Sequence, residues 1–260
     1  MKRVPAIRSI LLLAALFVSF SFVSCGNSGG QKVLRVGTNA EYPPFEYKSA
    51  DGKQFLGIDM DIAREIAAKL GYKLEIDDVQ FDSLIPSLMA GKFDMAMAAI
   101  TITPDRQKQV DFSVPYYTSN QAILVKSDST LQISSLDDLA KLKVGCQNGT
   151  TGQIYMDDNL VKPGKMKADN LIKFPTNIEA IAALNNGTID ALIIDDPVAA
   201  GYQKMQPVKK AFVITTDENY GIAFPKGSKL EDKVNGILKN LMASDTFNEI
   251  LHKQDSVNLK

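Results

Sequence analysis

The sequence of 260 residues contains no tryptophan, two cysteines and a single histidine, His252. One histidine excludes a His-based catalytic triad and a metal site built from several histidines. The chain also lacks a Gly-rich phosphate loop, an HExxH motif and a cluster of Cys and His ligands, so no metal and no other cofactor is expected. The net charge of −1 gives no basic excess, so nothing indicates a nucleic-acid partner.

The N-terminus carries a targeting signal. A basic segment, residues 2–8, precedes the apolar run 10–23, which is too short and too weakly flanked to be a membrane-spanning helix. We therefore expect residues 1–24 to be a signal peptide.

Cys25 follows a serine at the end of this segment, as in a bacterial lipobox, although Phe22 stands where leucine is usual. We expect Cys25 to be the acylated first residue of the mature protein, anchoring it to a membrane, with residues 25–31 as a flexible tether. A plain secreted protein is the alternative. The second cysteine, Cys146, then has no disulfide partner; it lies in a strand-like run and is expected to be a small buried residue, not a nucleophile.

Arginine is scarce after the leader, where only Arg35, Arg64 and Arg106 remain. Arg106 follows an apolar run that predicts a buried strand, and Thr103 with the proline after it predicts a helix start. Arg106 should therefore lie in the first turn of a helix, at the carboxyl edge of a sheet where open α/β proteins bind ligands. A guanidinium there fits a carboxylate bidentately; a surface arginine is the alternative.

Three motifs resemble the polar amino acid-binding proteins of bacterial ABC importers, and the likeness covers nearly all of the chain after the leader. The motifs are Gly37–Glu46, Gly57–Asp61 and Thr101–Arg106. The resemblance implies an α/β, two-lobed fold like that of type II periplasmic binding proteins, with a mostly parallel sheet in each lobe, flanking helices and a two-strand hinge. It also implies a monomer without enzymatic activity, located outside the cytoplasm and working with a membrane permease.

A short internal repeat in the sequence indicates two similar lobes. Residues 88–95 and 184–191 both predict a helix end, a glycine stop and a strand opened by aspartate, although coincidence is the alternative. With family knowledge, the expected parts are residues 32–118 and 221–260 for lobe 1, 119–220 for lobe 2, and hinge crossings near 118–120 and 218–221.

Local signals predict the main elements. Residues 32–38 and 72–77 predict strands, and apolar residues at helical spacing from 58 to 70 predict a helix stopped by Gly71. Helix caps are expected at Asp82, Thr103, Ser135, Thr176 and Ser228.

A free amino acid is a zwitterion, so a closed site must solvate both of its ends. We expect Arg106 to bind the carboxylate, with help from Thr101 and Thr151, and Asp195 to bind the ammonium. Asp196 should face elsewhere and cap the helix that follows.

The resemblance implies further site residues. Tyr42 and Phe81 would enclose the ligand side chain, although core packing is the alternative for both. Selectivity would depend on four positions, Asn39, Glu41, Gln147 and Ile194. Glu41 could supply a negative charge for a basic ligand or be a solvated loop residue. The full expected ligand-binding set is Asn39, Glu41, Tyr42, Phe81, Ala99, Thr101, Arg106, Gln147, Thr151 and Asp195.

The expected function is thus capture of a polar or basic L-amino acid, such as glutamine, arginine or lysine, by lobe closure, and its delivery to an ABC permease. Two alternatives share the fold. One is a dehydratase acting on cyclohexadienyl substrates such as arogenate, which needs a spare acid in the cleft. The other is a ligand-sensing surface lipoprotein.

Overall fold

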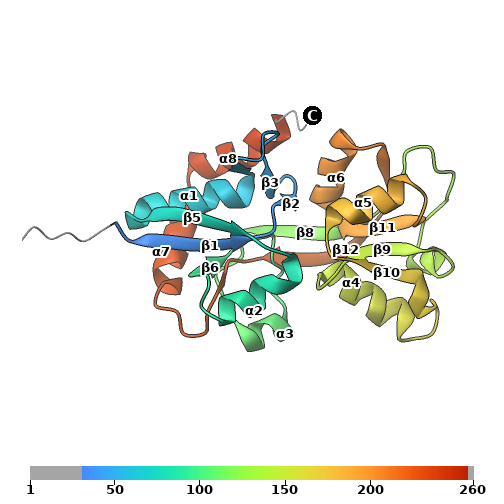
Figure 1. Cartoon of the computed structure of the whole chain (residues 1–260), viewed down its shortest axis with the longest axis horizontal. Helices are drawn as coiled ribbons and strands as arrows, with labels where there is room; N and C mark the ends of the chain where they lie inside the picture. Colours follow the sequence, from blue (N-terminus) through green and yellow to red (C-terminus); the bar gives the residue numbers. More distant parts are fainter. Residues whose placement is uncertain (1–30, 257–260) are drawn as a thin grey trace, which may run out of the picture. The chain divides into compact units, whose positions relative to one another are not determined.

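The computed structural model describes residues 31–256, so the expected signal peptide and Cys25 lie outside the described residues. Within 31–256 the strands form two five-stranded sheets and one three-stranded sheet (Figure 1). The small sheet has the order β2-β3-β4, with β2 Glu41–Tyr42, β3 Glu46–Lys48 and β4 Phe55–Leu56. These three strands were not predicted.

The first large sheet has the order β5-β1-β6-β13-β7. Strands β5, β1 and β6 are parallel neighbours, and β13 pairs antiparallel with both β6 and β7, so four of the five strands point the same way. The strands are β1 Val33–Thr38, β5 Lys73–Asp78, β6 Met95–Ala96, β7 Asp111–Phe112 and β13 Ala223–Phe224.

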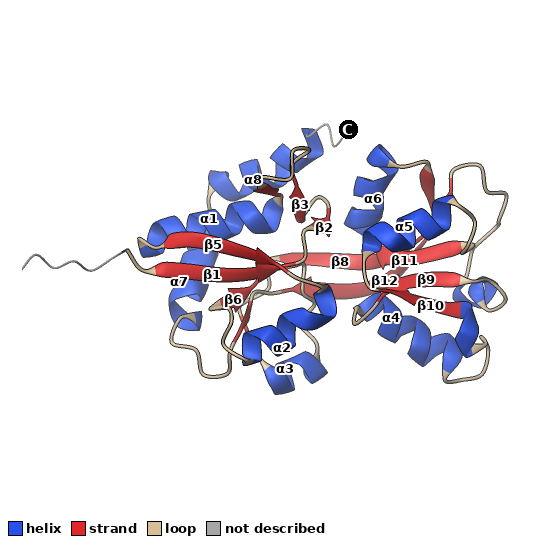
Figure 2. Ribbon diagram, in the orientation of Figure 1, coloured by secondary structure: helices blue, strands red, loops and turns tan. Residues whose placement is uncertain are grey.

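Helices cover both faces of this sheet, α1 on one side and α2 on the other (Figure 2). Ile62 and Ile66 of α1 are fully buried in the same cluster as Leu34 and Val36 of β1, which is what the apolar face of the predicted helix requires. The helix ends at Gly71 as expected, with a φ of 69° that favours glycine. The helical elements here are α1 Ile58–Leu70, η1 Phe81–Ser83, α2 Leu84–Met89, α3 Pro104–Gln109, α7 Glu231–Met242 and α8 Asp245–Ser256.

The second large sheet has the order β10-β9-β11-β8-β12, with the same pattern of three parallel neighbours and two antiparallel pairs. Its strands are β8 Tyr117–Lys126, β9 Val144–Gln147, β10 Leu171–Phe174, β11 Ala191–Asp195 and β12 Val208–Tyr220. Its helical elements are η2 Leu136–Leu139, α4 Thr151–Met156, η3 Asp157–Val161, η4 Ala168–Asn170, α5 Asn177–Asn185 and α6 Asp196–Met205.

The repeated segment occupies equivalent places in the two sheets. Gly91 and Gly187 both adopt left-handed backbone conformations, with φ of 73° and 79°, between a helix end and the strand that follows. Those strands, β6 and β11, are the third in each sheet order. The matching topology confirms the prediction of an α/β fold with two similar lobes.

Three of the five expected helix caps are formed. Ser135 begins η2 with a capping box, in which its backbone N–H and hydroxyl pair with the Asp138 carboxylate. The hydroxyls of Thr103 and Thr176 accept hydrogen bonds, of 3.2 and 3.1 Å, from the backbone N–H three residues on. Asp82 does not cap α2, because its carboxylate instead accepts a 2.7 Å bond from the Asn148 side chain. The Ser228 hydroxyl forms a local turn ahead of α7 and does not cap that helix.

The chain passes between the two large sheets twice. It leaves the first sheet after Phe112 and enters β8 at Tyr117, and it returns from the end of β12 to β13. In the register of the sheet, Tyr220 pairs with Tyr117, so the two passages run side by side. The carboxyl ends of β1, β6, β9 and β11 therefore supply the loops from which a ligand site can be built.

Candidate ligand-binding site

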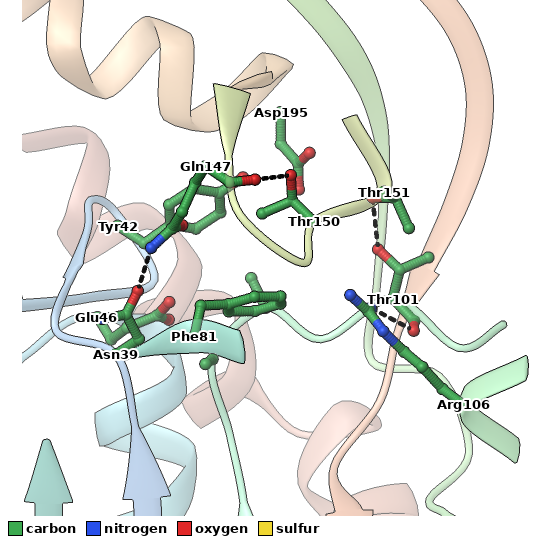
Figure 3. A pocket seen from close by; sticks show the side chains of 12 residues that line it. Asn39, Tyr42, Glu46, Phe81, Thr101, Arg106, Gln147, Thr150, Thr151 and Asp195 are labelled. Atoms are coloured by element: carbon green, nitrogen blue, oxygen red, sulfur yellow. Dashed lines mark hydrogen bonds between the residues drawn. The ribbon is translucent and has the colours of Figure 1, made fainter. Parts of the chain in front are cut away.

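One cavity brings together residues that follow the carboxyl ends of strands in both sheets (Figure 3). Nine of the ten residues in the predicted ligand-binding set line it; Glu41 does not. Glu46, Ala98 and Thr150 complete the lining and were not predicted. The full lining is Asn39, Tyr42, Glu46, Phe81, Ala98, Ala99, Thr101, Arg106, Gln147, Thr150, Thr151 and Asp195.

Arg106 is a buried residue of the cavity wall, only 8% exposed, and not a surface arginine. The Thr103 cap fixes the start of α3, which places the arginine side chain behind the carboxyl end of β6. Its Nη1 donates to the carbonyl of Thr101 at 2.8 Å, and its Nη2 donates to the carbonyl of Gly149, from the second lobe, at 3.1 Å. Burial lowers the pKa of Arg106, although the carboxylates of Glu218 and Asp195 act in the opposite direction. A guanidinium has five N–H donors, so these two bonds orient the group without exhausting it.

Asp195 ends β11 and is also buried. Its carboxylate accepts hydrogen bonds from the side chains of Gln121 and Tyr220. Burial, followed by the charge of Glu218, raises the pKa of Asp195 to about 7. The expectation that Asp196 caps the following helix is wrong, because the Asp196 carboxylate forms an ion pair with a lysine of β12.

The pleat of the small sheet decides which acid of the 39–46 loop enters the cavity. Tyr42 of β2 pairs directly with Glu46 of β3, so their side chains share one face, whereas Glu41 points to the other. Glu41 instead crosses to the second lobe, where its Oε1 accepts bonds from Gln147 Nε2 at 2.9 Å and from the backbone N–H of Asn177 at 3.1 Å. Burial raises the pKa of Glu41. Its contacts are those of a lobe-to-lobe link.

Gln147 connects the same two regions within the cavity wall. Its Nε2 also donates to Asn39 Oδ1 at 2.9 Å, while its Oε1 accepts a 2.7 Å bond from Asn177. Asn39 and Gln147 therefore face one another across the lobes (Figure 3). Their role in selectivity stays a prediction.

Glu218 is a further acid near the site, and no local pattern in the sequence singles it out. It accepts hydrogen bonds from Thr101 Oγ1 at 2.8 Å, Thr151 Oγ1 at 2.5 Å and Gln121 Nε2 at 3.0 Å. In the sequence it lies within a polar stretch before Tyr220, and only its place on the long strand β12 brings it to both threonines. It holds the two hydroxyls that we expected to serve a ligand carboxylate.

The two aromatic residues differ in their surroundings. The guanidinium carbon of Arg106 lies 5.3 Å from the centre of the Phe81 ring, within cation–π range. Tyr42 is buried and lowers the pKa of Asp195, against the larger effect of burial. Their enclosure of a ligand side chain stays a prediction.

The described part of the chain shows neither a metal-binding cluster nor a membrane-spanning helix. No group of three or more His, Cys, Asp or Glu residues within it is arranged to hold a metal ion. No helix among residues 31–256 is long and apolar enough to cross a membrane.

Two α/β lobes with a polar cavity between the carboxyl ends of their strands define a type II periplasmic-binding-protein-like fold. The chain belongs to the bacterial extracellular solute-binding proteins, family 3, whose model matches residues 34–254. It is 38% identical over 242 residues to the arginine-binding extracellular protein ArtP of Bacillus subtilis (strain 168), a match that covers 89% of this chain and 91% of ArtP.

Solved structures give the same assignment. An ancestral arginine-binding protein bound to arginine is 40% identical, with a TM-score of 0.80, and the match covers 86% of this chain and 98% of that one. The ancestral amino acid-binding protein AncCDT-1, a precursor of cyclohexadienyl dehydratase, is 41% identical, with a TM-score of 0.77 and coverage of 85% and 95%.

Proposed function

We propose that this protein captures an L-amino acid with a cationic side chain, arginine above all, by closing its two lobes on it, and delivers it to an ABC importer in the membrane. The observation that carries the proposal is the placement of Arg106, from α3 of one lobe, and Asp195, from β11 of the other lobe, in the wall of one cavity. A ligand that pairs with both is bound better when the lobes are closed, and this differential contact shifts the open–closed balance.

The two charged groups suit the two ends of an amino acid. The Arg106 guanidinium would take the carboxylate with the Thr101 and Thr151 hydroxyls nearby, and Asp195 would take the ammonium. Phe81 lies between Arg106 and the Asn39–Glu46 side of the cavity, where a long side chain would run (Figure 3).

Arginine is favoured over other amino acids by the relatives and by the acids in the cavity wall. The B. subtilis relative and the ancestral protein are both named for arginine. Two carboxyl groups, of Asp195 and Glu46, line the cavity with one guanidinium, so a ligand that brings a net positive charge improves the balance.

The remaining parts of the proposal concern anchoring and motion. Acylation of Cys25 would hold the protein at the outer side of a membrane, where the permease is. We place lobe 1 at residues 32–118 and 221–260, lobe 2 at 119–220, and the hinge at the crossings near 118–120 and 218–221. A register irregularity in β12 between Ile214 and Glu218 supports bending there.

A thermal-shift screen over the twenty amino acids tests the proposal. At a ligand concentration of about 100 times Kd the folded state gains about 2.7 kcal/mol, which corresponds to a rise in Tm of roughly 5–10 °C for a protein of this size. Arginine should give the largest rise. A screen in which no amino acid raises Tm would refute the proposal.

A dehydratase is the second candidate, because one structural neighbour is a precursor of cyclohexadienyl dehydratase. That precursor is itself described as an amino acid-binding protein, which favours binding over turnover here. Incubation of the purified protein with arogenate, followed by assay for phenylalanine, separates the two functions, since product formation would require an enzyme.

A further inference from the structure

Glu46 is the one acid of the cavity wall whose outer oxygen has no partner. The residue is 1% exposed, and its Oε2 has no hydrogen-bond partner among the described residues. The other acids close to the site are better satisfied: Asp195 has two donors and Glu218 has three. A buried carboxyl oxygen without a donor is costly, so Glu46 Oε2 is suited to accept a donor from a ligand in the cavity.

The position of Glu46 fits the far end of a long ligand. Glu46 and Asn39 lie on one side of the cavity, Arg106 lies on the other, and the Phe81 ring stands between them (Figure 3). A ligand whose carboxylate meets Arg106 would therefore send the end of its side chain toward Glu46.

A second buried acid, Asp59, lies beside Glu46. The first turn of α1 is tied to the turn before β3, because the backbone N–H groups of Ile58 and Asp59 donate to the carbonyls of Pro44 and Phe45, both at 3.0 Å. Gly57 makes this approach possible: its φ is 117°, and a Cβ there would lie 2.1 Å from the Phe45 oxygen. The two acids are thus forced together by the backbone.

Only one of these two carboxyl groups has donors that stabilise a negative charge. Asp59 accepts bonds from the backbone N–H of Ala99 at 2.9 Å and from the Tyr116 hydroxyl at 2.8 Å. The two carboxyl groups act on each other, because Asp59 raises the pKa of Glu46 whereas Glu46 lowers the pKa of Asp59. One proton held by the pair therefore belongs on Glu46, and the negative charge belongs on Asp59 with its two donors.

We propose that Glu46, paired with Asp59, is the specificity-determining acid for a cationic ligand side chain, and that it gives up its proton when such a ligand binds. This inference rests on the proposed function. In the empty site the pair holds one proton and one negative charge. When a guanidinium reaches Glu46, the proton leaves for the solvent and the new carboxylate accepts the guanidinium N–H donors. A neutral side chain of the same shape leaves the proton in place.

The groups around the pair also favour a proton on Glu46. Burial raises the pKa of Glu46 well above its ordinary range, and the charge of Asp59 raises it further. Burial raises the pKa of Asp59 to about 6. The other titratable groups that face the pair are Asp195, Glu41, Tyr116 and Tyr202, and no basic side chain is among them.

The test compares arginine with citrulline, which replaces the guanidinium by a neutral group of nearly the same shape. Titration calorimetry near pH 7, in buffers of different ionisation enthalpy, counts the protons released on binding. The unchanged protein should release about one proton more with arginine than with citrulline, or with glutamine as a second neutral ligand. Any contribution of Asp195 cancels, because all three ligands carry the same ammonium group.

Glu46→Gln should remove this difference. It should weaken arginine binding about 10- to 100-fold and change citrulline binding by about threefold or less. Glu41→Gln is the matched control: it makes the same acid-to-amide change on the same loop but outside the cavity. That variant should weaken both ligands by the same factor and keep the extra proton.

Equal proton release with arginine and citrulline in the unchanged protein would overturn the inference, as would an equal loss of both ligands in Glu46→Gln. The first result does not depend on whether the variant folds. Either outcome leaves amino acid binding intact, whereas failure of every amino acid to bind would refute the proposed function instead.

Discussion

Arg106→Ala should weaken arginine binding by about 30- to 4,000-fold, because removing one partner of a buried, hydrogen-bonded charge pair costs about 2–5 kcal/mol. The upper part of this range applies if the ligand carboxylate is left without a counter-charge. The side chain is 8% exposed, so water cannot readily replace it. Its present bonds, to the carbonyls of Thr101 and Gly149, hold the guanidinium fork in place at no cost to the ligand.

A loss of affinity alone would not show that Arg106 meets the carboxylate, since its bond to Gly149 also joins the lobes. Agmatine, which is arginine without its carboxylate, separates the two roles. If Arg106 is the carboxylate partner, agmatine should bind the alanine variant as well as it binds the unchanged protein, or better, because an unpaired cation has been removed. Calorimetry on both ligands and both proteins gives the coupling energy between Arg106 and the carboxylate.

Arg35→Ala provides the control. Arg35 forms an ion pair with Asp94 at 3.0 Å and its side chain is 45% exposed, so its loss should leave binding unchanged. If Arg106→Ala weakens arginine and agmatine by the same factor, the carboxylate assignment is wrong and Arg106 serves closure alone.

Three further outcomes are expected. Gly201→Ala would place a methyl group 2.6 Å from the Pro43 carbonyl oxygen of the other lobe, so it should oppose closure of the lobes. We expect arginine binding to weaken roughly 5- to 100-fold, with little change in the Tm of the ligand-free protein. Asp195→Asn should lower arginine affinity and flatten its pH dependence between about pH 6 and about pH 8, because affinity should rise as the unchanged Asp195, with a pKa of about 7, ionises. The free energy of unfolding of the ligand-free protein, measured with urea, should fall as pH rises toward about 7. Folding raises the pKa values of Asp59 and Asp195 to about 6 and about 7. Their contribution to the free energy of unfolding is therefore complete below about pH 4 and is lost as the two groups ionise.

Elements with a strong local signal were predictable from the sequence. The helix α1 has six apolar residues at helical spacing and a glycine stop, and the structure ends it at that glycine. The strands β2 to β4 have two or three residues each, too few for any periodic pattern. The strand β12 runs over residues 208–220, although the sequence favours a strand only over residues 211–215, because the polar residues that follow give no sign that the strand continues.

Some residues of the site could be located from the sequence, and others could not. Arg106 and Asp195 could be located because each follows an apolar strand, and the ends of such strands meet at one edge of a sheet. Glu41 and Glu46 could not be told apart, since both are acids of one loop in the sequence. The positions of their side chains depend on the pairing of Tyr42 with Glu46, which determines the face of the small sheet on which each side chain lies. Pairing between two-residue strands is a tertiary property, invisible in the local sequence.

The charges around the cavity connect the choice of ligand with the proton. Arg106 contributes one positive charge to the wall, while Asp195 and Glu46 can each contribute a negative one. A zwitterion adds no net charge, so it leaves one acid unbalanced in a region shielded from water, and that acid must keep its proton. Arginine brings the missing positive charge, so the same acid can ionise and be paired. The negative charge of this acid can therefore be neutralised in two ways, by a proton or by a cationic ligand side chain. Because the proton and the cationic side chain compete, the preference of the site for arginine depends on pH.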